Sequence, residues 1–460
     1  MSRKIVILGL GPCGLGAAWR LEELAHSDFA VFEKSSYPGG LAASFTDTNG
    51  FTWDIGGHVQ FSHYKYFDDV MDSLLAGEWM YHERESWVWI KEKFVPYPFQ
   101  NNIRHLPQPE MWKCLCGIIE LYNNNPNNNT KKNPSNFREW IVATFGEGLA
   151  DLFFFPYNYK VWACPPEKMM YGWVGERVSV PDLKRIIGNI IFNKDDVSWG
   201  PNNTFRFPLR GGTGEIWRRL HQKILKEVSF NHEAVEVNTS GKYVRFNNGH
   251  KEHYDFLIST MPLDKLIMIS DLKDKSAVPK LVHSSVHIFG VGLKGSPPEH
   301  IRKKCWIYFP ENDCPFYRGT IFSNYSPNNV PDIKHYWSLM LEVSESSDKK
   351  VDLSSLKEDV IKGLINTKMI ASSDDIVDFW HHFEEYGYPT PSIHRDDALK
   401  SLRDLDELGV FSRGRFGAWK YEVSNQDHTF MQGVEAVNRI ILNKDEITVW
   451  DPETVNNGKN

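Results

Sequence analysis

The chain has 460 residues, of which 41% are hydrophobic and 24% are charged, and its formal net charge is −7. This length exceeds one ordinary hydrophobic core, so two or three domains are expected. The negative balance and the lack of a basic block exclude a general nucleic-acid binder, which needs a positive face. No run of about 18 apolar residues occurs, so no membrane span is predicted.

The six cysteines are scattered through the chain, at positions 13, 114, 116, 164, 305 and 314. Cys114 and Cys116 have no second pair at zinc spacing, so reduced thiols are predicted and no metal site is expected. The apolar run at residues 5–8 is short and ends in glycines, which favours a buried strand over a signal peptide. The cytoplasm is therefore the predicted compartment.

The first predicted elements make a β-turn-α-β unit. Residues 5–8 predict a strand, residues 17–24 have helical periodicity, and residues 29–32 predict a second strand. This is the length of chain that a mononucleotide-binding half requires. The sequence therefore predicts a nucleotide site at the turn between the first strand and the helix.

Three glycines and one acidic residue stand where such a site needs them. Gly9, Gly11 and Gly14 follow the first strand, and they permit a tight turn, close approach of a pyrophosphate, and close packing of helix on strand. Glu33 ends the second strand, where a carboxylate can bind ribose hydroxyls. Together they predict that a dinucleotide binds at this turn.

A glycine pair, Gly39-Gly40, stands six residues beyond Glu33. This spacing resembles the extended fingerprint of FAD enzymes related to amine oxidases, which favours FAD over NAD. The arginine that usually follows the pair is Leu41 here.

The dinucleotide pattern occurs again at Gly290–Gly295, after a predicted strand. Ser296, Pro297 and Pro298 follow it, and they cannot open a helix at the required place. We interpret this second match as a strand end, so no separate nicotinamide site is predicted.

The remaining elements alternate between helical and β-rich stretches. Helices are predicted at residues 111–122, 136–155 and 182–193, with an Asn-rich loop at 123–133. Strands are predicted at 235–237, 243–246, 256–259, 284–293, 304–309, 316–322 and 336–343. A final helix is predicted at 428–442.

Nine blocks of sequence resemble eukaryotic-type UDP-galactopyranose mutases, which are flavoproteins related to the amine oxidase and protoporphyrinogen oxidase superfamily. The blocks are residues 56–59, 61–69, 95–102, 156–163, 175–178, 199–202, 210–214, 415–417 and 425–428. They run in order along nearly the whole chain, and only the Asn-rich tract and the tail after Leu442 fall outside the resemblance.

The resemblance implies an α/β fold in which a Rossmann-like FAD-binding domain carries an inserted helical domain and an antiparallel β-sheet substrate domain. The FAD-binding domain is expected to be discontinuous, over residues 1–85, 208–262 and 405–460. The helical domain is expected at 105–200, and the substrate domain at 86–104 and 263–404.

The implied activity is the interconversion of UDP-galactopyranose and UDP-galactofuranose without net redox change. In the family, the reduced flavin attacks the anomeric carbon of the sugar through its N5 atom, and UDP leaves and later returns. The implied cofactor is FAD, which must be reduced, and NADPH is the expected electron donor. An oligomer is possible.

The resemblance also assigns residues to the site. Arg318 and Arg177 are expected to clamp the pyrophosphate, because a guanidinium pairs bidentately with phosphate oxygens, and Arg177 is expected to close as a lid. His58 is expected in a loop against the flavin ring. The other expected cofactor contacts are Gly9, Gly11, Gly14, Glu33, Gly39, Gly40, Ser44, Gly56, Gly57, Val235, Arg415, Asn425, Gln426 and Thr429. The other expected substrate contacts are Tyr97, Phe99, Gln100, Asn158, Trp162, Asn202, Trp306, Tyr308, Tyr388 and Tyr421.

Two other functions share part of this sequence pattern. A flavin oxidase of the amine or protoporphyrinogen oxidase type predicts net substrate oxidation with oxygen uptake. A non-catalytic protein like the prenyl-GTPase escort proteins predicts a colourless preparation, whereas a flavoenzyme is yellow.

Overall fold

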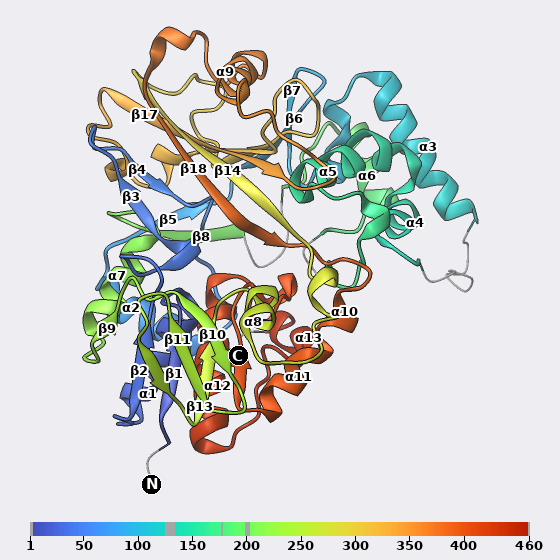
Figure 1. Ribbon diagram of the computed structural model, residues 1–460. Helices are drawn as coiled ribbons and strands as arrows, with labels where there is room; N and C mark the ends of the chain where they lie inside the picture. The colour runs from blue at the N-terminus through green and yellow to red at the C-terminus, as the bar shows by residue number, and fades with distance from the viewer. Residues whose placement is uncertain (1–2, 125–133, 176–177, 198–202, 459–460) are drawn as a thin grey trace.

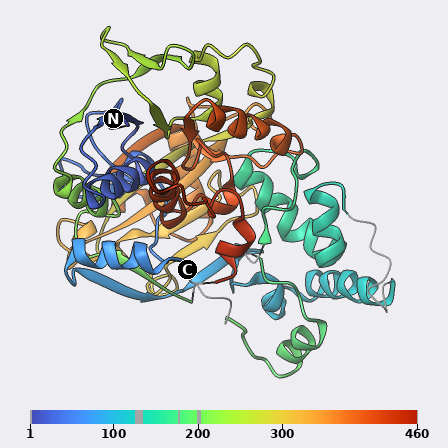
Figure 2. The ribbon, with the colours of Figure 1, turned by 90° about the horizontal axis from the view of Figure 1, so that it is seen from below.

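The computed structural model describes residues 3–124, 134–175, 178–197 and 203–458 (Figure 1). Two large sheets are stacked one above the other in this view, and a group of helices stands to one side of the upper sheet. Seen from below, the same helices again lie on one side of the molecule (Figure 2). Within the described part of the chain, no helix combines the length and apolarity that crossing a bilayer requires.

The lower sheet is parallel and has five strands, in the order β19-β13-β1-β2-β9. The strands are β1 (Ile5–Leu8), β2 (Phe29–Phe32), β9 (Val228–Ser229), β13 (Phe256–Ser259) and β19 (Val410–Ser412). Most of their apolar side chains are buried, as expected for a parallel sheet covered on both faces. The predicted β-turn-α-β unit is present, and its helix begins earlier than expected, as α1 (Pro12–Glu23).

Helix α1 packs against α12 (Gln426–Leu442), although the two lie at opposite ends of the sequence. Two glycines allow their backbones to touch. A Cβ on Gly16 would lie 2.3 Å from the carbonyl oxygen of Phe430, and one on Gly433 would lie 2.0 Å from that of Cys13. This contact fixes the N-terminus of α12 beside the glycine-rich turn that precedes α1.

The upper sheet has seven strands, in the order β18-β14-β17-β16-β15-β6-β7. They are β6 (Ser86–Ile90), β7 (Lys93–Pro96), β14 (His283–Lys294), β15 (Trp306–Tyr308), β16 (Arg318–Ile321), β17 (Tyr336–Glu345) and β18 (Ile376–Pro389). Neighbouring strands are antiparallel except for β15 and β6, which are parallel. The predicted combination of a Rossmann-like unit with an antiparallel sheet is therefore confirmed.

The second glycine pattern lies within β14, not at a turn. A Cβ on Gly290 would come within 2.5 Å of the Trp53 ring, and one on Gly292 within 2.6 Å of Phe51. These glycines make room for large aromatic side chains, which explains the pattern without a nucleotide. The predicted strand is confirmed, and it continues through most of the motif, to Lys294.

The helices beside the upper sheet are α3 (Gln108–Asn124), α4 (Phe137–Leu149), α5 (Phe155–Trp162) and α6 (Leu183–Ile191), with a π-helical segment at Ala150–Phe154. The helix predicted at 136–155 is distorted at Gly146, whose φ is 76°. A Cβ there would lie 2.5 Å from the backbone of Gly117, so close packing of α4 on α3 requires glycine at both positions.

Short elements connect these layers. They are the hairpin β3 (Ser44–Thr46) and β4 (Thr52–Asp54), the pair β5 (Trp79–Glu83) and β8 (Thr204–Pro208), and the small sheet of β10 (Ala234–Asn238), β11 (Tyr243–Phe246) and β12 (Lys251–His253). The other helices are α2 (Lys65–Leu75), α7 (Gly214–Lys223), α8 (Leu263–Ile269), α9 (Leu356–Asn366), α10 (Arg395–Ala398), α11 (Lys400–Glu407) and α13 (Pro452–Asn456).

Candidate active site

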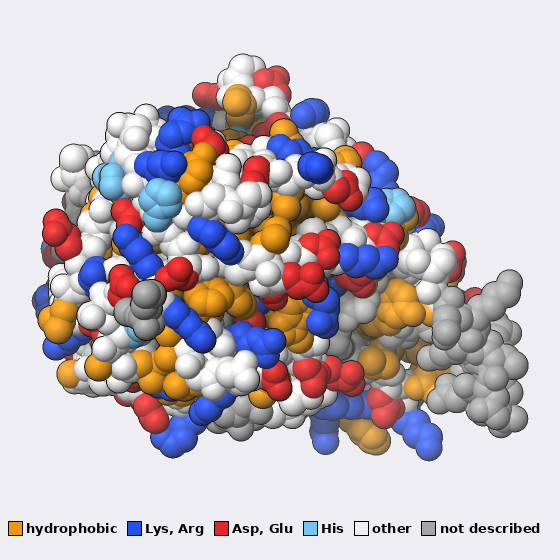
Figure 3. Space-filling view, turned by 60° about the horizontal axis from the view of Figure 1, so that its bottom comes forward, with side chains coloured by type: hydrophobic (Ala, Val, Ile, Leu, Met, Phe, Trp, Pro, Cys, Tyr) orange, Lys and Arg blue, Asp and Glu red, His pale blue; other side chains and the backbone are white. Residues whose placement is uncertain are grey.

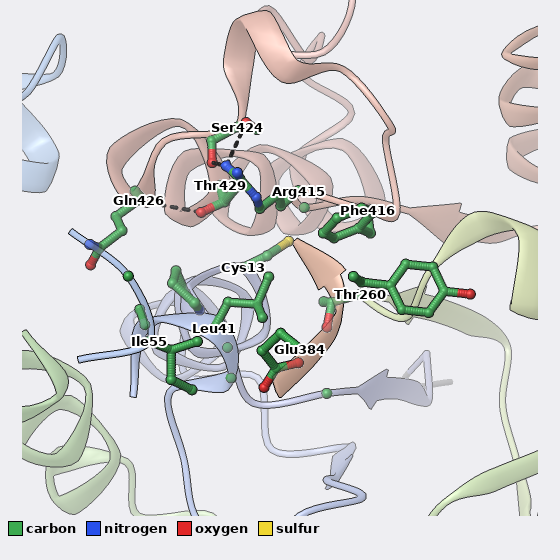
Figure 4. A pocket seen from close by; sticks show the side chains of 18 of the residues that line it. Cys13, Leu41, Ile55, Thr260, Glu384, Arg415, Phe416, Ser424, Gln426 and Thr429 are labelled. Atoms are coloured by element: carbon green, nitrogen blue, oxygen red, sulfur yellow. Dashed lines mark hydrogen bonds between the residues drawn. The ribbon is translucent and has the colours of Figure 1, made fainter. Parts of the chain in front are cut away.

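A cavity of about 550 Å³ lies where the glycine-rich turn, the start of α12, and strands β16, β17 and β18 meet. Figure 4 shows Cys13 and Leu41 from the N-terminal unit and Gln426 and Thr429 from α12 around this space. A volume of several hundred Å³ is typical of cofactor and ligand sites. The cavity is therefore the candidate site, and the first question is which ligand its walls fit.

The glycine-rich turn has one face built for protein packing and one face left open. Gly9 has φ +98°, and a Cβ there would lie 2.2 Å from Thr260 Oγ1, while a Cβ on Gly14 would lie 1.9 Å from the carbonyl oxygen of Gly9. At Gly11, by contrast, the nearest atoms to an added Cβ are 3.8 Å away or more, on Gly39 and Gly40. Gly11 lines the cavity, so its lack of a side chain serves the close approach of a ligand.

Glu33 lines the same cavity and is 5% exposed. Its Oε2 accepts a hydrogen bond from the Leu10 amide at 2.6 Å, and its Oε1 accepts one from the Ser35 amide at 2.8 Å. Each carboxylate oxygen can still accept a further hydrogen bond. The fixed carboxylate and the open glycine turn therefore fit the ribose and pyrophosphate of a dinucleotide such as FAD.

The start of α12 provides the opposite wall. Gln426 is held by two donors, because its Oε1 accepts hydrogen bonds from Gln60 Nε2 and Trp217 Nε1, each at 2.9 Å. Asn425, Gln426 and Thr429 all line the cavity. A helix N-terminus favours negative charge, which suits a ring that becomes electron-rich on reduction.

His58 lies in the glycine-containing loop on another side of the cavity. Its Nδ1 is buried and has no hydrogen-bond partner among the described residues. Burial, together with the nearby positive charges of Arg415 and Arg318, lowers the pKa of His58 to about 3. The imidazole is therefore neutral at physiological pH.

Arg318, on β16, also lines the cavity and is paired with the buried carboxylate of Glu342 on β17. Its Nε and Nη2 donate to the two carboxylate oxygens, each at 2.8 Å. Burial alone would lower the pKa of Arg318, but the Glu342 carboxylate beside it raises that pKa well above its ordinary value. Arg318 is a permanent cation on the cavity wall, with its Nη1 edge unused by the described residues.

Three of the predicted substrate residues form an aromatic group around a second arginine. The Tyr388 and Tyr421 ring centroids are 5.9 Å apart, and Trp162 lies 5.6 Å and 4.7 Å from them. The guanidinium of Arg415 stands 5.0 Å from the Tyr388 ring and donates to Ser424 Oγ at 2.9 Å, as Figure 4 shows for the latter contact. Tyr388, Tyr421 and Arg415 line the cavity, whereas Trp162 lies behind them.

A second aromatic group contains Tyr97, Trp306 and Tyr308. The rings of Tyr97 and Tyr308 are 5.3 Å apart, and Arg84 lies 5.4 Å from the Tyr97 ring and 5.1 Å from Trp306. Tyr157, which the sequence reasoning missed, lies 5.2 Å from Tyr308. None of these rings lines the cavity. The group lies beside it, because Tyr308 pairs with the cavity-lining Arg318 on the neighbouring strand.

Several predicted site residues have other contacts. Phe99 is fully buried and packs on Phe153, with 4.7 Å between ring centroids. Gln100 is fully buried, and its Nε2 donates to the Ser179 carbonyl at 2.5 Å. The Asn158 amide donates to the Phe154 carbonyl one helical turn earlier, at 2.8 Å.

Four predicted cofactor residues do not line the cavity. Gly14 and Gly39 support the turn from behind, and Val235 is 38% exposed while its neighbour Ala234 lines the cavity. The fourth, Ser44, is described below. Arg177 and Asn202, both predicted to bind substrate, lie outside the described residues.

Ser44 belongs to a buried network of hydrogen bonds around Asp54. Its Oγ donates to Asp54 Oδ1 at 2.5 Å and accepts from the Gly214 amide at 2.7 Å, and the Thr213 amide also donates to Oδ1, at 3.2 Å. These bonds join the β3–β4 hairpin to the N-terminus of α7. Ser44 therefore supports the walls of the site through Asp54.

This network predicts a pH-dependent stability. Burial raises the pKa of Asp54 to about 7, above the unfolded value of about 3.9. Between these two values the folded state binds more protons, so its stability falls as pH rises. Asp54→Asn removes this titration. The Tm of the variant minus the Tm of the natural protein should therefore be a few degrees larger at pH 8 than at pH 5. Thermal unfolding at both pH values checks this, and a constant difference would contradict it.

Asp427, at the start of α12, is 1% exposed and lines the cavity. Its Oδ2 accepts hydrogen bonds from the His63 amide at 3.0 Å and from His63 Nδ1 at 2.8 Å. Burial alone would raise the pKa of Asp427, but His428 and His63 lower it below its ordinary range. The ionised carboxylate ties the segment before α2 to α12.

Glu342, Tyr317 and Asp427 were not predicted from the sequence. One signal could have found Glu342: it stands in the run Leu339-Met340-Leu341-Glu342-Val343, where an acidic residue interrupts a buried apolar strand. A carboxylate is almost never buried unless it is paired. Tyr317 and Asp427 carry no comparable signal.

The fold and the site define a flavin-binding protein of the dinucleotide-binding α/β type. Residues 12–292 match the family of flavin-containing amine oxidoreductases. A crystal structure of reduced UDP-galactopyranose mutase is 47% identical to this chain, with a TM-score of 0.96, and the match covers 100% of this chain and 98% of that one. The chain therefore belongs to the flavin-containing amine oxidoreductases and, among them, to the UDP-galactopyranose mutases.

More distant structures share the fold alone. A putrescine oxidase bound to putrescine is 13% identical, with a TM-score of 0.64 and coverage of 96% of this chain and 99% of that one. A fatty acid isomerase from P. acnes is also 13% identical, with a TM-score of 0.66 and coverage of 95% and 99%. The oxidase alternative therefore corresponds to a distant relationship within the same fold.

Proposed function

We propose that this protein interconverts UDP-galactopyranose and UDP-galactofuranose without net redox change, using FAD that must be reduced. The observation that carries this proposal is the meeting of two features in one cavity. The open glycine turn and Glu33 suit a dinucleotide, while Arg318 and the tyrosines Tyr388 and Tyr421 present a cation and hydroxyl groups to the same space. An ordinary oxidase of amines has little use for a cation at this position.

Each part of the wall has a task under this proposal. The reduced flavin, when bound, supplies a nucleophilic nitrogen for the anomeric carbon of the sugar. Arg318 holds the diphosphate and stabilises it as it leaves, and Tyr388 and Tyr421 donate hydrogen bonds to it. His58, whose imidazole is neutral, lies in the loop that lines the cavity. Confining UDP close to the sugar favours its return to the rearranged ring.

The remaining site assignments are part of the same proposal. Arg177 closes over the substrate as a lid, Tyr97, Phe99 and Gln100 form the uracil end, and Tyr308 donates a hydroxyl to the diphosphate. Asn158, Trp162, Asn202 and Trp306 are assigned to the channel of the sugar nucleotide. The support is the position of Tyr97, Tyr308 and Trp306 in one aromatic group beside the cavity.

We also propose the three-part division stated above, with the FAD-binding domain at 1–85, 208–262 and 405–460. Its support is that the parallel strands come from these three segments, whereas β6 and β7 join the upper sheet.

A cytoplasmic location is supported by six unpaired cysteines. Charges of both signs mix on the face in Figure 3. NADPH as reductant rests on the resemblance.

The proposal is tested with purified protein, UDP-galactofuranose and anaerobic buffer, with and without dithionite. UDP-galactopyranose should accumulate after reduction and form only slowly with oxidised flavin, and chromatography of the nucleotides measures both. Equal rates in the two states would refute the proposal. Oxygen uptake that matches substrate loss, measured in a parallel assay in aerated buffer, would refute it too. A colourless preparation that does not take up FAD would refute it as well.

A further inference from the structure

Tyr421, one of the two tyrosines that line the cavity beside Arg415, lies on a short 3-10 turn, Tyr421–Val423, just before α12. A 3-10 turn has poor hydrogen-bond geometry and adds little stability of its own. The position of the Tyr421 side chain therefore depends on what holds the turn. The next residue is Glu422, whose side chain is 12% exposed and does not line the cavity.

Glu422 is bound at both carboxylate oxygens by one buried arginine. Nη1 of Arg395 donates to Glu422 Oε2 at 2.7 Å, and Nη2 donates to Oε1 at 2.9 Å. The Arg395 side chain is 4% exposed. Burial alone would lower the pKa of Arg395, but the Glu422 carboxylate beside it raises that pKa above its ordinary value. A bidentate pair of this kind fixes orientation as well as distance.

Arg395 also connects the turn to the strand of the other tyrosine. Arg395 begins α10, which follows the end of β18, and Tyr388 lies in the last part of that strand. The Arg395 amide donates to the Ser392 carbonyl at 3.0 Å, which fixes its backbone in the short connection from β18. The ion pair therefore joins the segments that carry Tyr388 and Tyr421, whose ring centroids are 5.9 Å apart.

The backbone of the turn is held from two other elements. Nε2 of Gln432, on α12, donates to the Val423 carbonyl at 2.7 Å. Nδ2 of Asn456, on the C-terminal helix α13, donates to the Glu422 carbonyl at 3.1 Å. These bonds attach the turn to the FAD-binding half of the molecule, whereas the Glu422 side chain attaches it to the segment after β18 in the upper sheet.

We propose that Glu422 is a positioning residue, whose ion pair with Arg395 holds Tyr421 beside Tyr388 so that both hydroxyl groups reach the diphosphate of the sugar nucleotide. This inference rests on the proposed function and extends it to an ion pair outside the cavity. Glu422 itself does not touch the substrate under this proposal. Its whole effect on nucleotide binding passes through the Tyr421 hydroxyl.

A double-mutant cycle on UDP affinity tests this claim, with anaerobic calorimetry on the dithionite-reduced protein. Tyr421→Phe should weaken UDP binding about tenfold, as expected for a lost hydrogen bond to a charged group. Glu422→Gln should weaken it about fivefold, because glutamine loses the charge and turns a donor toward Arg395. In the double variant, Glu422→Gln should add less than about twofold to the loss from Tyr421→Phe, because no hydroxyl remains to be positioned.

Two results of the cycle would overturn the proposal. Fully additive losses would mean that Glu422 supports the site in general and not through the Tyr421 hydroxyl. Natural affinity in Glu422→Gln would mean that ring packing alone places Tyr421, whose centroid is 4.7 Å from that of Trp162 and 5.3 Å from that of Trp173.

Asp396→Asn is the matched control. Asp396 accepts a hydrogen bond from Nε of the same Arg395 at 3.0 Å, but its side chain is 63% exposed and it belongs to α10. An exposed partner contributes little, so UDP affinity should stay within about twofold of the natural value. A loss as large as that of Glu422→Gln would show that any disturbance of Arg395 has the same effect, and would overturn the proposal.

Flavin absorbance and Tm show whether each variant is folded and loaded. If Glu422→Gln does not fold, Arg395→Lys takes its place in the cycle, because lysine keeps the charge and loses the bidentate geometry. Its loss of affinity should again disappear in the Tyr421→Phe background, and additive losses would overturn the inference. If the natural protein neither bound UDP nor isomerised the sugar nucleotide, the proposed function would fail instead.

Discussion

Arg318→Ala should reduce turnover of UDP-galactofuranose by about 100-fold or more, as expected for the loss of a group that stabilises a departing diphosphate. The substitution removes a cation from the cavity wall and leaves the buried Glu342 without its ionic partner. Arg318→Lys keeps the charge but cannot present a planar fork. Its turnover should therefore lie between that of the natural protein and that of Arg318→Ala. Steady-state rates with dithionite-reduced protein measure all three.

Arg302→Ala provides the control for removal of an arginine. The Arg302 side chain is 51% exposed and pairs with Glu299 on the surface, so turnover should stay within about twofold of the natural value. Because an unpaired buried carboxylate is destabilising, flavin content and Tm must be measured beside the rates. Normal turnover in a folded, flavin-loaded Arg318→Ala protein would remove Arg318 from the mechanism.

Gly14→Ala should weaken FAD binding by about 100-fold. The added Cβ would lie 1.9 Å from the carbonyl oxygen of Gly9 and 2.9 Å from its carbonyl carbon, and both are backbone atoms of the turn. Displacing that turn costs about 3 kcal/mol, the upper range for overpacking, and about 1.4 kcal/mol is tenfold in affinity. Titration of the apoprotein with FAD, followed by flavin fluorescence, gives the dissociation constant.

Gly188→Ala is the matched control. Gly188 lies in α6, an added Cβ there meets no atom within 4 Å, and alanine favours a helix. This variant should purify as yellow as the natural protein. Equal FAD affinity in Gly14→Ala and Gly188→Ala would show that the glycine-rich turn does not cradle the cofactor.

The FAD-binding half of the fold could be predicted because its physical requirements are local. Strands at 5–8, 29–32 and 256–259 are buried apolar runs, and the glycines and Glu33 are spaced by the geometry of one turn. Strand β18 was missed because it lies at the edge of its sheet, where exposed and partly buried residues alternate and polar residues such as His381 and Glu385 interrupt the apolar pattern.

The site was predicted in part for a related reason. Arg318, His58, Tyr388 and Tyr421 could be assigned through a resemblance in sequence, and the structure gathers them at one cavity. The contacts that hold these residues in place could not be predicted, because the hydrogen bonds of Glu342 join β17 to residues 24 and 285 positions away along the chain. No local pattern encodes such pairings, since they exist only after the sheet and the loop have been brought together.

A crystal structure of the dithionite-reduced protein with UDP-galactopyranose tests the central claim most directly. The account predicts FAD along the glycine-rich turn and Glu33, with the diphosphate of the sugar nucleotide bound by the free Nη1 edge of Arg318 in the same cavity. The anomeric carbon should then lie within about 3.5 Å of the flavin nitrogen that attacks it. A nucleotide bound away from this cavity, or a diphosphate remote from Arg318, would contradict the account.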